Sequence, residues 1–233
     1  MSTKANNRTQ LKKLLALESK ERMKDELFDR LLDGGEDIHL LTYEPMIDAG
    51  DFNPNIYIVK NGLIRGTYLD RNNEITVGFA LPGTLIISFH SYFDNEPSYY
   101  RYEACCPSTV VRIPKAHFDK MTKESHEFAL WVMSAHQNQL FYNEVRNKVL
   151  SGDAKERLLQ LKRRLSSTLT TDTEVPSTSG DNHNLKMKQQ LDSRYKTIYS
   201  IVPSKIIASY LGITEQHLSR IKKEILKEST EKS

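Results

Sequence analysis

The chain has 233 residues, with 33 Lys and Arg against 30 Asp and Glu, a net charge of +3 at pH 7. This length allows two modest domains or one large one, and no apolar run approaches the roughly 20 residues of a membrane helix. The N-terminal MSTKANNRTQ lacks the apolar core of a secretory signal, and the two cysteines, Cys105 and Cys106, are neighbours that cannot form a disulfide framework. We therefore expect a soluble cytoplasmic protein with no membrane partner.

Charge is distributed unevenly along the chain. Residues 153–233 contain 15 Lys and Arg against 10 Asp and Glu, a net charge of +5, whereas residues 1–152 contain 18 against 20, a net charge of −2. A basic C-terminal part suits contact with a phosphate backbone. The excess is small, so it supports a nucleic-acid partner only together with a motif.

The chain begins with a helical region, predicted over residues 1–37. Gln10 to Leu32 carries apolar side chains at helical spacing and is predicted to form one charged amphipathic helix, which ends at Asp33-Gly34-Gly35. Residues 38–116 then show short β-type runs separated by turn residues, at a spacing of about ten residues that is typical of a β-sandwich or a jelly-roll barrel. We expect an α+β protein in which this β-barrel is one domain.

A long helix and a hinge are predicted over residues 117–152. One apolar stripe of this helix contains Phe128, Trp131, Val132, Ala135, Tyr142, Val145 and Val149, and a second contains Leu130, Met133, Leu140 and Phe141. A helix that is apolar on two faces can pack on its own barrel and on a partner helix at once. We therefore predict a homodimer with contacts through Phe128, Trp131, Val132, Ala135, Tyr142 and Val145; the alternative is that both stripes are buried within one chain.

Residues 153–233 are predicted to form a second, helical domain. Ser151-Gly152-Asp153 breaks the helical pattern and is the expected hinge, and a basic helix follows from Lys155 to Arg164. Residues 166–184 are rich in Ser, Thr, Asp and Gly with almost no apolar content, which predicts a flexible loop inside this domain.

The most informative stretch is PSKIIASYLGITEQHLSRIKKEIL, Pro203 to Leu226. Ser204 can cap a first helix, Gly212 can leave it with positive φ, and Thr214 can cap a second helix. Ala208 falls where the helices would cross, and the apolar positions Leu218, Ile221 and Ile225 are spaced by three and four. The pattern predicts a helix-turn-helix, which lays its second helix in the DNA major groove; the alternative is a helical hairpin with a solvated basic face.

The order of barrel, long helix, hinge and helix-turn-helix resembles the Crp/Fnr family of bacterial transcription regulators. The resemblance covers about Ile38 to Leu226 and rests on IYIVKNGLIRGTYLDRNNEITVGFALPGTL, on EACCPSTVVRIPKAHFDKM and most specifically on IIASYLGITEQHLSRIKKEIL. It implies a sensory cyclic-nucleotide-binding-like barrel, a long dimerisation helix, a palindromic double-stranded DNA site and RNA polymerase as a partner.

The effector region departs from the family members that bind cyclic AMP. They carry a Gly-Glu pair and an Arg-Ser/Thr pair, and the positions that match here are Ile87-Ser88 and Ser98-Tyr99. A cyclic phosphate would lack its guanidinium partner, so we expect no cyclic AMP binding, and Arg101 is the one nearby guanidinium. The effector, if there is one, is unidentified, and its pocket is either filled by the protein's own side chains or small and apolar, with Leu85, Ile87, Ser88, Phe89, Ser98, Tyr99 and Arg101 as candidates.

No cofactor or metal is predicted. Iron–sulfur members of the family need four cysteine thiolates, and the metal-ligand spacing of a cupin enzyme is absent, as is any catalytic constellation. Haem stays open, since one histidine can serve as an axial ligand and the chain has seven, at positions 39, 90, 117, 126, 136, 183 and 217. For the adjacent cysteines we favour a buried structural role over redox reactivity.

The resemblance also assigns the residues that would read DNA. Arg220 matches the family's base-reading arginine, which contacts guanine O6 and N7 in a bidentate manner, and Gln216 can pair with adenine in the same way. The predicted base-reading set is Glu215, Gln216, His217, Ser219 and Arg220, and the predicted backbone contacts are Ser204, Lys205, Thr214, Lys222 and Lys223. Only KESTEKS follows Leu226, so we expect no full β-hairpin wing.

Two functions of different classes follow. The first is a non-enzymatic, sequence-specific transcription regulator, and the second is a ligand-binding or protein-docking barrel protein whose helix-turn-helix does not bind DNA. Replacing Arg220 with Ala distinguishes them.

Overall fold

The computed structural model describes residues 2–17, 19, 21, 23–71, 73–159 and 201–230. They belong to two compact units, Met1–Asn143 (unit 1) and Glu144–Ser233 (unit 2). No helix among these described residues is long and apolar enough to cross a membrane. The predicted loop 166–184 and the C-terminal end of the predicted basic helix lie outside the described residues, and the predicted domain boundaries remain predictions.

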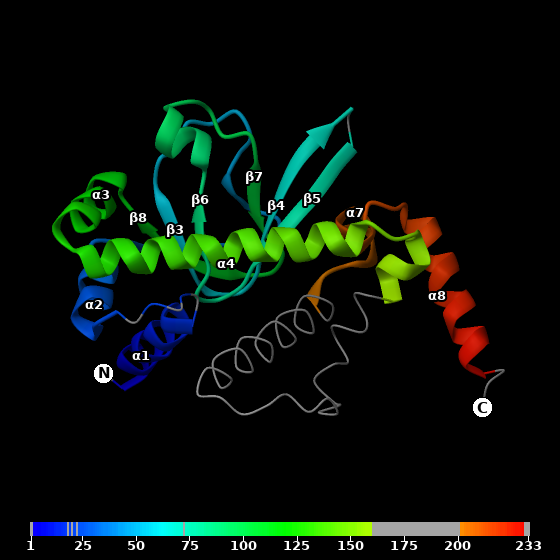
Figure 1. Ribbon diagram of the computed structural model, residues 1–233, viewed down its shortest axis with the longest axis horizontal. Coiled ribbons are helices and arrows are strands. Elements are labelled where there is room, and N and C mark those ends of the chain that lie inside the picture. Colours follow the sequence, from blue (N-terminus) through cyan, green and yellow to red (C-terminus); the bar gives the residue numbers. More distant parts are fainter. Residues whose placement is uncertain are drawn as a thin grey trace. The chain divides into compact units, whose positions relative to one another are not determined.

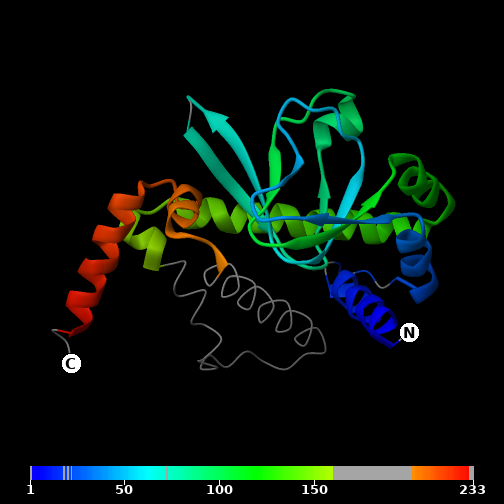
Figure 2. The same ribbon diagram turned by 180° about the vertical axis from the view of Figure 1, so that it is seen from behind.

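Unit 1 is built on two antiparallel four-stranded sheets that pack face to face (Figures 1 and 2). The first sheet has the order β1-β8-β3-β6, with bounds Glu36–Leu40, Ser108–Ile113, Ile56–Asn61 and Leu85–Ile87. The second has the order β2-β7-β4-β5, with bounds Pro45–Ile47, Arg101–Ala104, Ile64–Asp70 and Asn73–Ala80. The predicted β-strands are thus confirmed as a β-sandwich, but the predicted barrel is not closed, because the described strands pair as two separate sheets.

The alternation of side chains along the strands determines what each sheet face buries. Val59 pairs with Val110 in the first sheet, and Ile64 pairs with Ala80 and Ala104 in the second; all five are buried in one cluster between the sheets. Successive side chains of a strand point to opposite faces. Ile56, Ile58, Leu85 and Ile87 therefore face away from that cluster, toward the helices.

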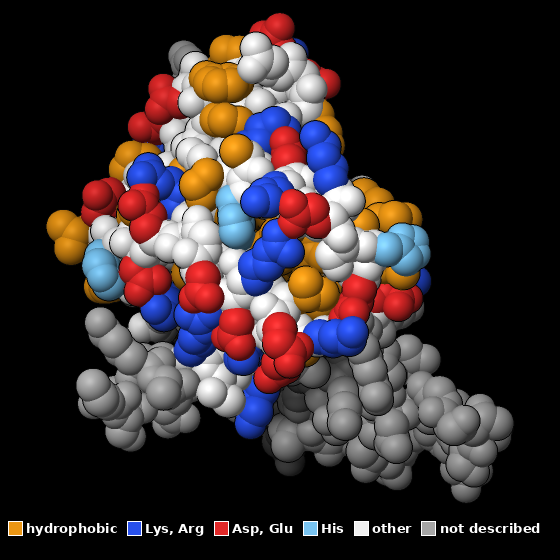
Figure 3. Space-filling model, turned by 90° about the vertical axis from the view of Figure 1, so that its left-hand side faces the viewer, with side chains coloured by type: hydrophobic (Ala, Val, Ile, Leu, Met, Phe, Trp, Pro, Cys, Tyr) orange, Lys and Arg blue, Asp and Glu red, His pale blue; other side chains and the backbone are white. Residues whose placement is uncertain are grey.

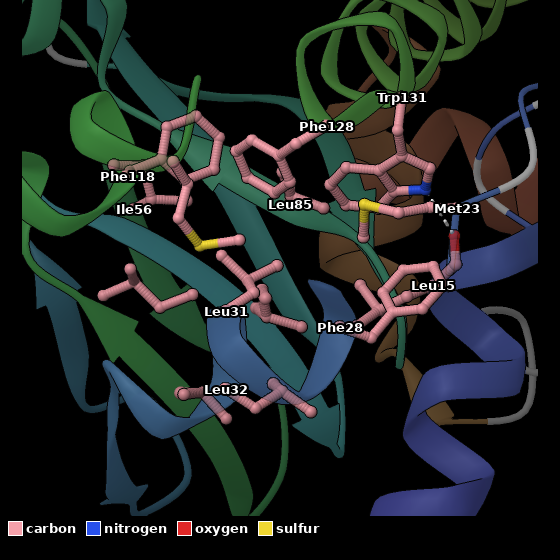
Figure 4. Close-up of a cluster of buried hydrophobic side chains, with 14 of the residues drawn as sticks. Leu15, Met23, Phe28, Leu31, Leu32, Ile56, Leu85, Phe118, Phe128 and Trp131 are labelled. Carbon is pink, nitrogen blue, oxygen red and sulfur yellow. Dashed lines mark hydrogen bonds between the residues drawn. The ribbon is translucent and has the colours of Figure 1, made fainter. Parts of the chain in front are cut away.

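In the described part of unit 1, four α-helices and a short π-helix, η1 (His90–Asp94), accompany the sandwich. The α-helices are α1 (Ser2–Leu17), α2 (Asp25–Asp33), α3 (Lys115–Glu124) and α4 (His126–Leu150). Their apolar side chains and the outer face of the first sheet form a second buried cluster, which contains Phe28, Leu31, Phe118, Phe128 and Trp131 (Figure 4). Phe28 meets Trp131 edge to face at 5.6 Å, and the Trp131 indole N–H donates to the Leu15 carbonyl at 3.3 Å. This cluster fixes the N-terminal half of α4 to the sandwich.

The single helix predicted from Gln10 to Leu32 is wrong in one respect, because the structure has two helices there. A continuous helix of that length would extend about 35 Å, which is too far for Leu11, Leu15, Phe28 and Leu31 all to enter one cluster. The chain turns between α1 and α2, where the Ser19 hydroxyl accepts the Glu21 N–H at 3.1 Å. Both apolar stripes then reach the same core.

Unit 2 contains a helical segment at residues 154–159, α7 (Ser204–Tyr210) and α8 (Glu215–Thr230). Ile206, Ile207 and Ala208 of α7 are buried, and so are Leu218 and Ile221 of α8. The two helices predicted within Pro203–Leu226 are therefore confirmed as α7 and α8.

Candidate nucleic-acid interface

A tight turn joins α7 to α8, and its geometry follows from Gly212. This residue has φ +66°, a left-handed conformation that glycine adopts without steric cost. The Gly212 N–H donates to the Ser209 carbonyl at 3.1 Å and the Ile213 N–H to the Ala208 carbonyl at 3.0 Å. These two bonds are the Schellman arrangement that ends a helix, so the predicted role of Gly212 is confirmed.

Thr214 then starts α8. Its hydroxyl accepts the His217 N–H at 3.2 Å, and its carbonyl accepts the Leu218 N–H at 2.9 Å. A threonine that satisfies the N3 amide is an N-cap. The predicted cap is confirmed, and it positions the first turn of α8.

The outward face of α8 carries the predicted base-reading residues. Glu215, Gln216, Ser219 and Arg220 are exposed, and His217 is half-buried. The Arg220 side chain is 69% exposed and its Nε lies 3.7 Å from the Glu224 carboxylate. An exposed pair of this kind contributes little free energy, so it leaves the guanidinium able to exchange its partner for a base.

The predicted backbone-contact residues lie around the same element. Lys205, Thr214 and Lys223 are exposed, whereas the Lys222 ammonium donates to the Ser204 hydroxyl at 3.1 Å and so links α8 to α7. The predicted cap at Ser204 is wrong: Pro203 holds the cap position without a side-chain bond, and Ser204 is the first helical residue. The Ser204 hydroxyl accepts the hydrogen bond from Lys222 instead.

Two arginines that sequence reasoning missed hold the C-terminal end of α7. The Arg157 guanidinium donates through Nη1 to the Leu211 carbonyl at 3.0 Å and through Nε to the Gly152 carbonyl at 2.8 Å. Arg146 lies 5.2 Å from the centre of the Tyr210 ring and donates to the Tyr210 carbonyl at 3.5 Å. The acceptors are backbone carbonyls, which carry no signature in the sequence.

In unit 1, the structure does not bring the candidate effector residues to one site. Leu85 and Ile87 are buried on the helix side of the sandwich, with Phe128 and Trp131. Ser88 and Ser98 are buried, whereas Phe89 and Tyr99 are 45% and 54% exposed. Leu85 and Ile87 are thus part of the buried core, whereas Phe89 and Tyr99 are exposed to solvent, and the effector pocket stays a prediction.

Tyrosines occupy the inner face of the second sheet beyond the apolar cluster. Gly66 pairs with Tyr102, on the same face as Ile64, and Tyr68 follows two residues later. The Tyr68 ring stacks on Tyr99 at 5.8 Å and meets Tyr100 edge to face at 6.3 Å, and Tyr100 in turn lies 6.3 Å from Tyr102. Burial raises the pKa of Tyr102 above its ordinary value. The protein's own phenol rings thus line this part of the sandwich.

The opposite face of the same sheet carries an ion network. Arg65, almost fully buried, bonds Glu103 at 2.7 Å and Glu74 at 2.7 Å, and Arg101 bonds Glu103 at 2.9 Å and Asp48 at 2.6 Å. Burial opposes the charge on Arg65, but the hydrogen bond to Glu103 holds its pKa above the ordinary value. Arg101 therefore points away from the tyrosines and is already engaged by two carboxylates.

The two stripes of α4 differ in exposure. Phe128, Trp131 and Ala135, predicted as dimer contacts, are at most 3% exposed, and the first two lie in the core of unit 1. Val132 packs against that core; Tyr142 and Val145 lie in α4, but their side chains are outside the described set. The exposed stripe is the other one, with Leu130, Met133, Leu140 and Phe141 between 37% and 64% exposed. Phe128, Trp131 and Ala135 are therefore not accessible to a second chain, contrary to the prediction.

Comparisons with known proteins agree with this architecture. Residues 39–125 match the family "Cyclic nucleotide-binding domain". The fold is similar to that of FixK2 from Bradyrhizobium japonicum, with a TM-score of 0.60, 16% identity, and coverage of 84% of this chain and 86% of that one. No curated protein matches the chain in sequence.

Two further solved structures share the fold. One is the c-di-GMP responsive global regulator CLP of Xanthomonas campestris, with a TM-score of 0.62, 12% identity, and coverage of 88% of this chain and 93% of that one. The other is a CooA mutant from Carboxydothermus hydrogenoformans, with a TM-score of 0.58, 15% identity, and coverage of 88% and 87%. The structural match therefore extends over both units. The sequence identities are low, so the match shows a shared fold and nothing more.

Proposed function

We propose that the protein is a homodimeric, sequence-specific DNA-binding transcription regulator of the Crp/Fnr type. The observation that carries this proposal is the pair α7 and α8, with a Schellman turn at Gly212, an N-cap at Thr214 and a polar face on α8. This local geometry supports a helix-turn-helix, and such an element inserts its second helix into the major groove.

Arg220 and Gln216 have the chemistry to read bases. A guanidinium matches guanine O6 and N7 in a bidentate manner, and a carboxamide matches adenine N6 and N7, each pair discriminating by about 1–3 kcal/mol. Arg220 and Gln216 are both exposed near the start of α8. Glu215 can accept from cytosine N4, while His217 and Ser219 lie beside these residues and would complete the base contacts.

The exposed stripe of α4 supports the homodimer. Leu130, Met133 and Leu140 recur at helical spacing on one face, and the opposite face is buried in unit 1. A solvent-facing apolar stripe on a long helix is suited to a second copy of the same helix. A two-fold dimer would place two copies of α8 on successive half-sites of a palindrome, and RNA polymerase would be the partner through which such a bound dimer acts.

In this proposal the sandwich does not use cyclic AMP. Tyr68, Tyr100 and Tyr102 line its interior, and Arg101 faces the other side of the sheet, paired with Glu103 and Asp48. The cyclic phosphate would therefore have no guanidinium from Arg101. Any effector of unit 1 is unidentified.

The test replaces Arg220 with Ala in the full chain and measures binding to a selected duplex and to a random one. We expect specific affinity to fall about 5- to 150-fold, which corresponds to the loss of about 1–3 kcal/mol, while random-duplex binding changes little. The matched variant Lys223→Ala removes one charge from the same helix and should weaken both complexes equally while reducing the salt slope by about one. If the parent chain prefers no duplex over a random one, and R220A leaves regulation in the cell intact, the docking protein is favoured instead.

A further inference from the structure

We propose that Arg157 is a positioning residue for the reading helix: its guanidinium ties the turn that precedes α8 to the Gly152 carbonyl of the hinge. The inference rests on the proposed function, because it concerns how α8 is aimed at DNA. The structural basis is the set of four backbone carbonyls at the C-terminal end of α7, one of which accepts a hydrogen bond from Arg157.

The last carbonyls of a helix lack intrahelical partners. In α7 the Ala208 and Ser209 carbonyls accept the Ile213 and Gly212 amides of the Schellman turn. The next two, on Tyr210 and Leu211, accept from Arg146 and Arg157. All four are thus satisfied, two by the turn itself and two by arginines from the segment before α7. Positive charge is also favoured at this end of a helix by the macrodipole.

Arg157 binds two segments at once. Its Nη1 is 3.0 Å from the Leu211 carbonyl, and its Nε is 2.8 Å from the Gly152 carbonyl. Gly152 lies between the end of α4 at Leu150 and the helical residues 154–159. One planar guanidinium therefore joins the hinge backbone to the residue that precedes the turn glycine.

The arginine is itself held in place. The Glu156 N–H donates to the Asp153 carboxylate at 2.8 Å, and the Asp153 N–H donates to the Glu156 carboxylate at 3.2 Å. This reciprocal pair is a capping box, and Arg157 is the next residue of the helix that it starts. The Arg157 N–H also donates to the Asp153 carbonyl at 2.8 Å. Rotation of the hinge at Gly152 would turn its carbonyl away from the guanidinium and release the turn.

Lysine cannot replace this arginine. An ammonium is a point donor on a flexible stem, whereas the guanidinium presents donors in a rigid fork, and here two of them reach carbonyls of different segments. The variant Arg157→Lys would keep the charge and the favourable interaction with the helix end while losing the bridge. The conservative variant thus separates the bridge from the charge.

The experiment compares the full-length chain with R157K and R157Q, and with K148A as a control that removes an exposed charge outside the contact. Affinity for the selected duplex, affinity for a random duplex and the thermal unfolding midpoint are measured. We expect both Arg157 variants to lose at least tenfold in specific affinity, with random-duplex binding within about twofold of the parent and cooperative unfolding retained. K148A should match the parent in both affinities and in the thermal unfolding midpoint.

A second readout does not require DNA. Nitroxide labels at Asn147 and Lys227, both exposed and in unit 2, are placed in a chain with Cys105 and Cys106 replaced by Ser and diluted with unlabelled protein. R157K should broaden the distance distribution between the labels, and K148A should leave it unchanged.

The outcomes separate the two proposals. If the parent chain selects no sequence, the DNA-reading function fails, and the distance distribution alone decides the role of Arg157. If the parent binds specifically and R157K binds equally well with an unchanged distribution, the positioning role is overturned. Loss of cooperative unfolding in both variants would assign Arg157 to folding and would also overturn it.

Discussion

At the scale of single residues, Arg65 and Glu103 form a buried ion pair in the second sheet. Their side chains are 8% and 5% exposed, and they join β4 to β7 across the sheet. Removal of the Glu103 carboxylate leaves the buried Arg65 guanidinium with Glu74 as a carboxylate partner, and the loss of a buried hydrogen bond between charged groups costs about 1.5–3 kcal/mol. We predict that Glu103→Ala lowers the free energy of unfolding by that amount.

Denaturant unfolding checks this prediction, with Glu124→Ala as a control that removes an exposed carboxylate paired with Arg30. The control should change stability by less than about 1 kcal/mol. A Glu103→Ala chain as stable as the control would show that the network adds nothing to the sheet.

Cys105 and Cys106 are adjacent but lie in different surroundings. Burial raises the pKa of the Cys105 thiol to about 12, whereas Cys106 is half-buried. At pH 8 such a Cys105 is about one part in 10⁴ thiolate, and only the thiolate is nucleophilic. This agrees with the structural role predicted for this cysteine and makes it a poor redox sensor.

We predict that a Cys106→Ser chain, with Cys105 intact, resists alkylation at pH 8 and becomes reactive in denaturant. Its rate in the folded state should rise about tenfold per pH unit up to the pKa, because the thiolate fraction does. Mass spectrometry of the alkylated chain gives the rate, with Cys105→Ser as the matched variant. Rapid labelling of Cys105 in the folded protein would contradict the assignment.

At the scale of elements, α4 separates a buried face from an exposed one. Met133 and Leu140 are 61% and 64% exposed, and Phe89 and Phe93, stacked at 6.0 Å, add exposed rings beside the helix through the contact of Phe89 with His136. This apolar surface is what the proposed dimer would bury.

We predict that Met133→Lys combined with Leu140→Lys converts the dimer to a monomer, because four lysines would be brought together in an apolar interface. Sedimentation velocity measures the state, and Ala116→Lys on α3 is the control. A double variant that remains dimeric would place the interface elsewhere.

The sequence predicted local features of these elements well and long-range ones poorly. Gly212 and Thr214 act on backbone groups within four residues, so their roles could be inferred from spacing. The face to which Leu85 and Ile87 point depends on which strand pairs with which, information that a short apolar run lacks. The same limit hid the turn between α1 and α2 and the bonds of Arg157 to distant carbonyls.

At the scale of the whole molecule, the N-terminal and C-terminal parts of the chain differ in net charge. On the end of unit 1 that carries α2 and α3, acidic and basic side chains are interspersed (Figure 3), and several are paired, as in Arg30–Glu124 and Lys115–Asp119. A mixed surface of this kind does not attract a polyanion. The net excess of Lys and Arg lies in residues 153–233, which include α7 and α8.

The measurement that tests the central claim most directly is selection of bound sequences from a random duplex pool by the purified, ligand-free chain at near-physiological salt. We predict enrichment of an inverted repeat whose half-sites lie about 10–10.5 base pairs apart or a multiple of that spacing, as a two-fold dimer with one reading helix per copy requires. The enriched duplex should lose its advantage with R220A. A pool that shows no enrichment, with binding only at low salt and equally to every duplex, would contradict sequence-specific recognition by α8.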